Sequence, residues 1–227
     1  MNSTEHHERM WRVPVTYAAV GCTRVERLSD PPPGFSVIQR NGRIGHGPER
    51  FEWAWVQALS WGIQRGSGLR VTPLPAPEAV TGSSYTPVSF DDDGNPLTPA
   101  TLEGDGETIY APDGTALMRP GDTGILHAPW WPREIPVRVV YLVDEPQQRG
   151  FAYGTLPGHP LSGEEAFIIE QRPDDSVWLT VRIVSRPATG LLRFFTPIVR
   201  LVQSRVVTRY LRALAGPIGV DPANAHR

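Results

Sequence analysis

The second half of the chain alternates apolar and polar residues with a period of two, which is the pattern of a half-buried β-strand. Four segments carry this pattern, and each has the length of a strand: 137–143, 150–155, 165–171 and 177–183. Within the first segment, Val137, Val139 and Tyr141 are expected to share one face of the sheet. The short connections between the segments, such as Pro173-Asp174-Asp175, predict an antiparallel meander.

The first half of the chain is less regular. Residues 13–24 predict a strand or an extended segment that leads into the fold, and residues 69–72 predict a short strand. Asn41-Gly42 is the strongest hairpin signal in the sequence, because both residue types tolerate the positive φ of a type I′ turn. It predicts a turn between two strands, at 35–40 and 43–46.

Two segments have the periodicity of an amphipathic helix. The first begins at Gly47-Pro48, where proline suits the first helical position, and ends near Arg65. The second covers residues 189–215. Its interior Pro197 predicts either a kink or a second helix that begins there with Thr196 as its N-cap.

The stretch 73–130 is rich in proline, and three short segments within it have strand character: 85–90, 108–111 and 124–127. A structureless loop of this length is uncommon in a compact domain, so we expect hairpins or an insertion at about 80–130. The sequence predicts a single domain over residues 12–216, with flexible tails at 1–11 and 217–227.

Together these elements predict an α+β fold. An antiparallel sheet with one apolar face needs a cover, and the two amphipathic helices can supply it. The expected architecture is a curved antiparallel β-sheet packed against a long C-terminal α-helix and a shorter helix from the N-terminal half. A curved sheet that grips a long helix commonly leaves a cavity between the two layers, and by analogy we expect one here.

The sequence contains 22 arginines and no lysine. A Schiff-base lysine and a phosphate-loop lysine are therefore excluded. The net charge of −2 gives no basic field for nucleic acid, so no nucleic-acid partner is expected. Any acid or base in a cavity must come from His, Tyr, Asp or Glu.

Targeting and redox signals are few. The N-terminus is polar and no run of about 18 apolar residues occurs, so neither a signal peptide nor a transmembrane helix is expected. The one cysteine, Cys22, excludes an intramolecular disulfide. The expected compartment is the cytoplasm and no cofactor is expected, whereas the oligomeric state stays open.

The connection between the second and third strands of the meander carries the densest group of polar residues. We select Tyr153, His159 and Glu165 as candidate catalytic residues, because an imidazole near a carboxylate is in outline a general acid–base pair. The alternative is a rigid hairpin without chemistry, in which Pro157-Gly158 turns the chain and Ser162 forms part of a capping box.

Aromatic and polar residues on the strands and the first helix are candidates to line a cavity. The predicted ligand-binding residues are Trp61, Tyr141, Tyr153, Thr155, His159, Trp178 and Arg182. No metal site is predicted, because the histidines outside the N-terminal tail are far apart in sequence. Trp130-Trp131 lies between two prolines and is expected to be partly exposed, over a cavity or against a partner.

Several runs of sequence are similar to those of one family. They are Arg138 to Pro146, Gly150 to Pro160, Ser162 to Phe167, Ser185 to Pro187, Arg209 to Leu214, Tyr17 to Gly21, Gly45 to Gly47 and Arg65 to Leu69. On these runs the chain resembles the uncharacterised family DUF1990, also called UPF0548, over roughly residues 14–72 and 135–214. The resemblance implies no common activity. It implies a similarity to helix-grip proteins of the START or Bet v 1 kind, which bind lipids or polyketides in a cavity.

Three hypotheses about function follow. The first is binding of a hydrophobic small molecule, lipid-like or polyketide-like, between the sheet and the C-terminal helix. The second is a cofactor-independent enzyme for proton transfer, cyclisation or hydrolysis that uses the hairpin 153–165. The third is an interaction module that contacts a protein or a membrane surface through Trp130-Trp131 or the C-terminal arginines. Whether the protein is an enzyme stays open at this point.

Overall fold

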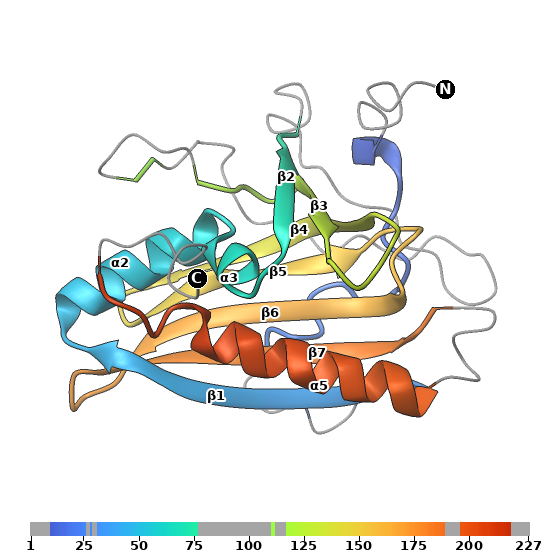
Figure 1. Ribbon diagram of the computed structural model, residues 1–227. Helices are drawn as coiled ribbons and strands as arrows, with labels where there is room; N and C mark the ends of the chain where they lie inside the picture. Colours follow the sequence, from blue (N-terminus) through green and yellow to red (C-terminus); the bar gives the residue numbers. More distant parts are fainter. Residues whose placement is uncertain are drawn as a thin grey trace.

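The computed structural model describes residues 10–25, 28, 31–76, 110–111, 117–188 and 196–218. Seven strands form one sheet in the order β1-β7-β6-β5-β4-β3-β2 (Figure 1), and every neighbouring pair is antiparallel. The strands are β1 (Ser36–His46), β2 (Arg70–Leu74), β3 (Thr123–His127), β4 (Ile135–Glu145), β5 (Gln148–Thr155), β6 (Leu161–Gln171) and β7 (Ser176–Pro187). The predicted meander is therefore confirmed, and β1 extends it by pairing with β7.

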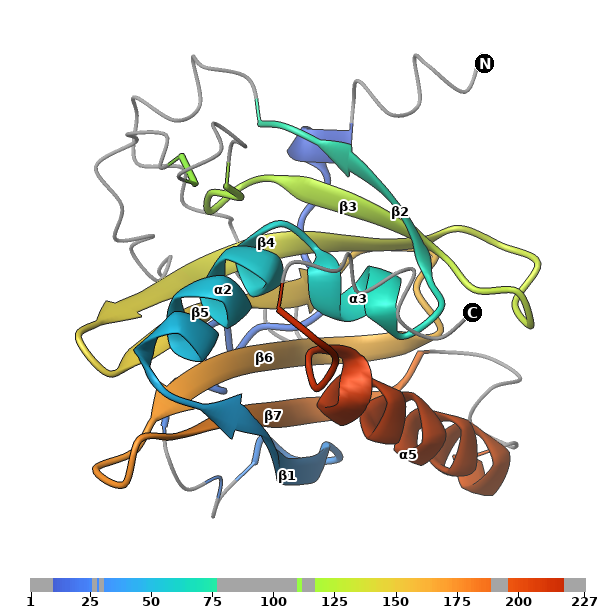
Figure 2. The same cartoon turned by 60° about the vertical axis from the view of Figure 1, so that its left-hand side comes forward.

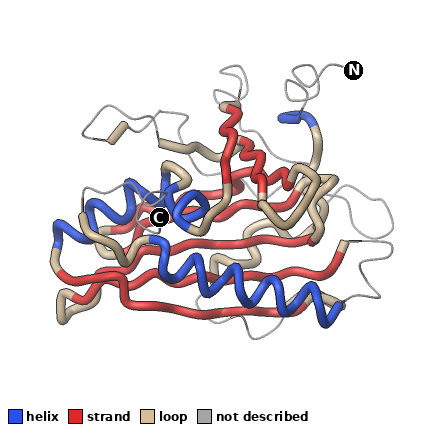
Figure 3. The backbone as a smooth tube through the Cα atoms, in the orientation of Figure 1, coloured by secondary structure: helices blue, strands red, loops and turns tan. Residues whose placement is uncertain are grey.

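Three α-helices cover one face of the sheet: α2 (Pro48–Leu59), α3 (Gly62–Gly66) and α5 (Thr196–Ala213). They lie on the same side of the curved strands, and α5 runs in front of β7 (Figures 1, 2 and 3). Contacts of α5 with β1, β7 and α3 hold it in place. The expected α+β fold is confirmed, because a curved antiparallel sheet packs against a long C-terminal helix and a shorter helix from the N-terminal half.

The opposite face of the sheet is covered by the N-terminal segment 10–25. This segment begins with the short 3-10 helix η1 (Met10–Arg12) and places Val15 and Tyr17 against Ala152 and other apolar residues of the sheet. The strand considered for residues 13–24 is not formed, because these residues make turns and are tied to the sheet by side chains. The sheet is therefore buried on both faces.

The prediction of a hairpin at Asn41-Gly42 is wrong. Residues 36–46 form one continuous strand, in which Gly42 lies opposite Leu179 of β7. The glycine has a packing role instead, because a Cβ atom placed on it would lie 3.4 Å from the Cβ of Leu211 on α5. A long pairing partner and the close approach of a helix therefore override the local turn preference.

The expected face of Tyr141 is also wrong. Val139 pairs with Tyr153 and Tyr141 pairs with Ala152, so Val140 is an extra residue in β4 and forms a β-bulge. A single inserted residue moves every later side chain to the other face of the sheet. Tyr141 is therefore buried against the N-terminal segment, whereas Val139 faces the helices.

The first of the two helical predictions needs a correction. The first helix is interrupted at Trp61, whose φ of 66° and ψ of 17° are left-handed, so α3 starts anew after α2. At the C-terminus, α5 begins at Thr196 with Pro197 in its first turn. Residues 189–195 of the predicted helix lie outside the described residues, so the two alternatives for Pro197, a kink or a second helix that begins there, stay predictions.

Some expectations fall outside the part of the chain that the structure describes. They include the strand predicted at 85–90 and most of the insertion predicted at 80–130. The strands predicted at 69–72 and 124–127 are confirmed as β2 and β3. Among the helices in the described ranges, none is long and apolar enough to cross a membrane.

Candidate functional site

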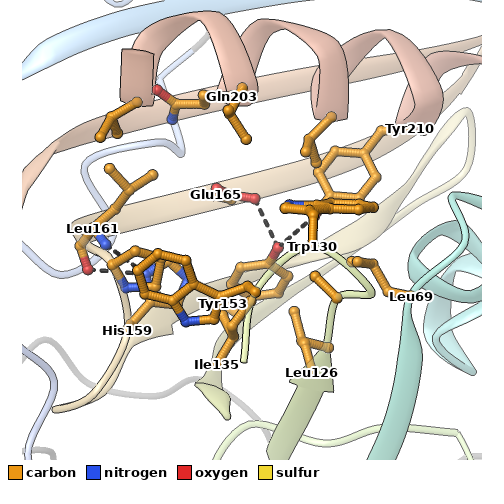
Figure 4. A pocket seen from close by; sticks show the side chains of 16 residues that line it. Leu69, Leu126, Trp130, Ile135, Tyr153, His159, Leu161, Glu165, Gln203 and Tyr210 are labelled. Atoms are coloured by element: carbon orange, nitrogen blue, oxygen red, sulfur yellow. Dashed lines mark hydrogen bonds between the residues drawn. The ribbon is translucent and has the colours of Figure 1, made fainter. Parts of the chain in front are cut away.

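A cavity of about 380 Å³ lies between α5 and the sheet, bounded by residues from 128–135 and 159–161 (Figure 4). Its walls are mainly apolar and include Leu69, Leu126, Ile135, Leu161, Val202 and Val206. Polar groups come from Tyr153, His159, Glu165, Gln203 and Tyr210, and the indoles of Trp130 and Trp131 add N–H groups to the lining. Tyr153 and Glu165 come from the middle strands of the sheet and Gln203 and Tyr210 from the helix above, so the two layers meet in this site.

Tyr153 and Glu165 form the polar centre of the cavity. They lie directly opposite each other on β5 and β6, and the hydroxyl of Tyr153 donates a hydrogen bond of 2.7 Å to Oε2 of Glu165. The hydroxyl of Tyr210, on α5, is 3.4 Å from that of Tyr153. The second carboxyl oxygen of Glu165 has no hydrogen-bond partner among the described residues. One unsatisfied oxygen therefore remains next to the open space.

Burial changes the acid–base properties of this group. It raises the pKa of Glu165 to about 7, although the hydrogen bond from Tyr153 acts in the opposite direction. The pKa values of Tyr153 and Tyr210 are also raised, first by burial and then by the nearby carboxylate. The two phenols therefore stay neutral at physiological pH, whereas Glu165 changes its charge close to neutrality.

His159 lies at another part of the cavity wall and makes no hydrogen bond to Tyr153 or Glu165. Its Nδ1 lies 2.9 Å from both the backbone nitrogen and the backbone oxygen of Leu161. Burial lowers the pKa of His159 to about 4, so the ring is neutral near pH 7. When Nδ1 accepts the Leu161 N–H, the ring proton is on Nε2, which has no partner within the described ranges.

Trp61 supports the cavity floor from behind rather than lining it. The left-handed turn between α2 and α3 directs its indole between the helices and the sheet, where it stacks on Tyr153 at 6.3 Å between ring centroids. It also contacts the edge of Phe151 at 5.9 Å. An aromatic cluster of this kind fixes the orientation of Tyr153 and hence the position of its hydroxyl.

Comparison of the sequence with known families now identifies the chain. The model of the family described as "Domain of unknown function (DUF1990)" matches residues 16–90 and 102–213. The chain belongs to this family. The match includes Tyr153, Glu165 and Tyr210, so the polar centre of the cavity lies within the DUF1990 region.

Two curated relatives carry the name UPF0548. A UPF0548 protein of Deinococcus radiodurans is 40% identical over 115 residues, which are 46% of this chain and 58% of the relative. The UPF0548 protein At2g17695 of Arabidopsis thaliana is 41% identical over 76 residues, which are 30% of this chain and 37% of the relative. The chain thus matches little more than half of the first relative and about a third of the second.

Solved structures show a looser likeness. A hypothetical protein of Helicobacter pylori, jhp0584, has a TM-score of 0.45 at 9% identity, over 81% of this chain and 89% of that protein. Ara h 8.0201 has a TM-score of 0.38 at 9% identity, over 78% of this chain and 96% of that protein.

Five of the seven predicted ligand-binding residues do not line the cavity: Trp61, which lies behind it, and four residues that lie away from it. Tyr141 and Arg182 lie on the opposite face of the sheet, where they bond Thr23 through its hydroxyl and its backbone oxygen, respectively. Thr155 bonds the hydroxyl of Thr16 at 2.6 Å. Trp178 is half-buried near the β6–β7 turn, and Arg172 stacks on its ring.

Of the predicted site residues, the cavity brings together Tyr153, His159 and Glu165.

Tyr210 and Gln203 are site residues that the sequence reasoning did not select. Tyr210 belongs to the apolar stripe of the last helix, and only the packing of that helix over β5 and β6 reveals its proximity to Tyr153. Gln203 is a buried polar residue on the inner side of α5, and its amide nitrogen donates to the hydroxyl of Ser185. In the sequence, the signal that could have identified Gln203 is a glutamine next to the apolar positions of the last helix.

The rim of the cavity contains the exposed tryptophan pair. Trp130 is 43% exposed, and the guanidinium of Arg209 stacks over its ring at 4.9 Å. Trp131 is half-buried and also lines the cavity, so the expected partial exposure of this pair is observed. Within the described ranges, no three His, Cys, Asp or Glu side chains come together as a metal site.

Proposed function

We propose that this protein binds a hydrophobic small molecule, lipid-like or polyketide-like, in the cavity between the sheet and α5. The observation that carries the proposal is the make-up of the cavity, which has about 380 Å³ of space, mainly apolar walls and a few polar groups at its centre. Small-molecule sites are typically concave, of roughly 300 to 1,000 Å³, largely apolar and marked by a small number of placed polar groups.

The packing of α5 supports the same proposal. Val207 and Ala213 of this helix are buried in the core, whereas Val199, Val202 and Val206 line the cavity. Protein interiors normally fill such space with side chains, because an empty apolar cavity forfeits dispersion contacts. An apolar occupant would restore these contacts, and its binding would stabilise the protein.

Two measurements test this proposal. Native mass spectrometry of protein purified without detergent should show a retained apolar ligand, or the apoprotein should bind the fluorescent probe N-phenyl-1-naphthylamine with saturation. Val206→Trp should fill the cavity and remove probe binding. Leu201→Trp is the matched control, because Leu201 is on the same helix but is exposed and does not line the cavity. Equal probe binding by both variants, with wild-type melting behaviour, would refute the proposal.

A second candidate function is proton transfer on a molecule bound in the same cavity. The favouring observation is the Tyr153–Glu165 pair, since a carboxyl group with a pKa of about 7 can both take and give a proton near neutral pH. His159 would help to position a substrate through Nε2, because Nδ1 is already held by Leu161. This differs from the imidazole–carboxylate pair expected from the sequence.

The enzymatic candidate has its own experiment. Dodecan-2-one incubated with the protein in D₂O should gain deuterium next to its carbonyl group faster than in buffer, as followed by proton NMR. Glu165→Gln should abolish the gain, and Tyr210→Phe should reduce it less, because Tyr210 makes no hydrogen bond to the carboxylate in the described structure. If Glu165→Gln exchanges deuterium as fast as the wild type, proton transfer by this residue is excluded.

A further inference from the structure

The charge distribution of the cavity is one-sided. Glu165 is the acidic residue among the described residues that line it, and the lining contains no arginine. The chain has no lysine that could supply another positive charge. Arg209 is at the rim, where its guanidinium is stacked on the outer tryptophan, Trp130. Among the described residues, no cationic side chain is thus in contact with the buried carboxyl group of Glu165.

Aromatic rings surround this carboxyl group. Tyr153 and Tyr210 present their rings and hydroxyl groups beside Glu165, and Trp130 forms part of the wall (Figure 4). The face of an aromatic ring carries negative electrostatic potential and attracts cations, most strongly where water is excluded. A carboxylate among aromatic rings, with one oxygen unpartnered, has the composition of a binding site for an ammonium group.

We propose that the cavity selects amphiphilic amines, with the ammonium group at the unpartnered oxygen of Glu165 and the apolar chain along the valines of α5. This inference rests on the proposed function, since it names the class of hydrophobic ligand. The fold has already removed Glu165 from water, so an incoming cation needs to lose only its own hydration. The amine would donate to the carboxylate, and its charge would lie among the aromatic rings.

The same arrangement disfavours the corresponding carboxylates. A fatty-acid head group beside Glu165 would place two negative charges together in an apolar cavity. The nearby phenol of Tyr153 already donates to Glu165, and His159 carries no positive charge near neutral pH. An alcohol would avoid the repulsion but would gain no charge–charge attraction. The expected order of affinity is therefore amine, then alcohol, then carboxylate.

The experiment compares three probes with the same chain: dodecylamine, dodecanol and dodecanoate, each below the concentration at which it forms micelles. Displacement of N-phenyl-1-naphthylamine at pH 8 should show dodecylamine binding about tenfold more tightly than dodecanol, as charge-assisted hydrogen bonds are stronger than neutral ones. Dodecanoate should bind most weakly. Equal binding of dodecanol and dodecylamine would overturn the inference.

Variants assign the selectivity to one residue. Glu165→Gln should bind dodecylamine and dodecanol equally and should gain affinity for dodecanoate. Glu170→Gln is the matched control, because it removes the same charge from the same strand at a site where Glu170 contacts Arg172 instead of the cavity. Thermal melts of both variants verify folding. Persistence of the amine preference in folded Glu165→Gln would exclude Glu165 as the counter-ion.

The pH dependence gives an independent readout. Amine binding should rise about tenfold from pH 6 to pH 8, because Glu165 must lose its proton while the amine keeps its own. The other titratable groups that line the cavity keep their charge over this range, because the phenols of Tyr153 and Tyr210 and the ring of His159 stay neutral, and the guanidinium of Arg209 is stacked on Trp130 at the rim. Glu165→Gln should show no such rise, and a rise that survives in this variant contradicts the assignment.

The outcomes distinguish failure of the amine selectivity from failure of the proposed binding function. If the fluorescent probe shows no saturable binding and no ligand is retained, the binding function itself fails. If all three bind with equal affinity, the binding function stands and the selectivity for amines fails.

Discussion

The hydroxyl of Tyr153 donates to Oε2 of Glu165 at 2.7 Å across the β5–β6 pair, in a space enclosed by α5. The two residues are direct partners in the register, so the sheet itself holds the phenol and the carboxyl group together. Trp61 packs behind the phenol and restricts its orientation. A buried acid–phenol pair is thus built into the central strands of the sheet.

Replacement of Tyr153 by Phe should raise the pKa of Glu165 further above 7. The phenol stabilises the ionised carboxylate by donating a hydrogen bond to it. Without this bond, nothing offsets the desolvation that disfavours the ionised form. We expect an increase of about one pH unit, measured by NMR titration of a ¹³C-labelled glutamate side chain. Tyr210→Phe is the control, since Tyr210 bonds the phenol and not the carboxylate. A lowered pKa in Tyr153→Phe would contradict this account.

Glu165 and His159 should have opposite effects on stability as the pH changes. Glu165 has a pKa of about 7 in the folded state against 4.5 ordinarily, so its contribution to stability is present below about pH 4.5 and is lost as the pH rises through 7. His159 has a pKa of about 4 against 6.5, so its contribution is present above about pH 6.5 and is lost as the pH falls through 4. Each contribution is about 3 kcal/mol, and the two nearly cancel between pH 5 and 6.5.

Single variants should separate the pH-dependent contributions of Glu165 and His159 to stability. In Glu165→Gln, the free energy of unfolding should gain about 1.4 kcal/mol for each pH unit relative to the wild type between pH 5 and 6.5. In His159→Gln the free energy should fall relative to the wild type over the same range. Urea unfolding followed by tryptophan fluorescence measures both. Parallel pH profiles for the wild type and Glu165→Gln would rule out the raised pKa of the carboxyl group.

Much of the fold could be predicted because it is determined by patterns within short stretches of the sequence. Strands β4 to β7 come from segments that alternate apolar and polar residues and are separated by short turns, so their order and their antiparallel pairing follow from the sequence pattern. The grouping of Tyr153 with Glu165 was predictable for the same reason. A hairpin with a short connection brings residues on its two strands opposite each other.

The remaining features depend on information that is not local. The bulge at Val140 falls in the run Val139-Val140-Tyr141, where all three residues suit a buried strand, so the pattern gives no sign of the face change. The proximity of Tyr210 to Tyr153 depends on how α5 lies over the sheet. The continuity of β1 through Gly42 depends on β7 and on the contact with α5.

Glu164→Gln should loosen the N-terminal segment without affecting the cavity. Glu164 is fully buried on the face opposite Glu165 and accepts hydrogen bonds from Tyr17 and from the backbone nitrogens of Gly21 and Thr23. A glutamine amide turns one of these acceptors into a donor, so about 1–3 kcal/mol of stability should be lost.

Hydrogen exchange measures this change residue by residue. The amides of Gly21 and Thr23 should exchange faster in Glu164→Gln, while binding of N-phenyl-1-naphthylamine stays at the wild-type level. Glu165→Gln serves as the reciprocal control, because it lies on the other face and should leave both amides protected. Unchanged protection in Glu164→Gln would mean that other contacts hold the segment.

Gly124→Ala should destabilise the protein by displacing Trp61. A Cβ atom at position 124 would lie 2.6 Å from Cη2 of the indole, and the indole cannot retreat easily because it is stacked on Tyr153. Overpacking of this kind typically costs about 1–3 kcal/mol. Trp61→Phe removes the atoms in conflict, so adding Gly124→Ala to that variant should cost much less. Chemical unfolding of the four proteins in this cycle measures the coupling. Additive costs would show that the methyl group is accommodated by a shift of β3 instead of a shift of the indole.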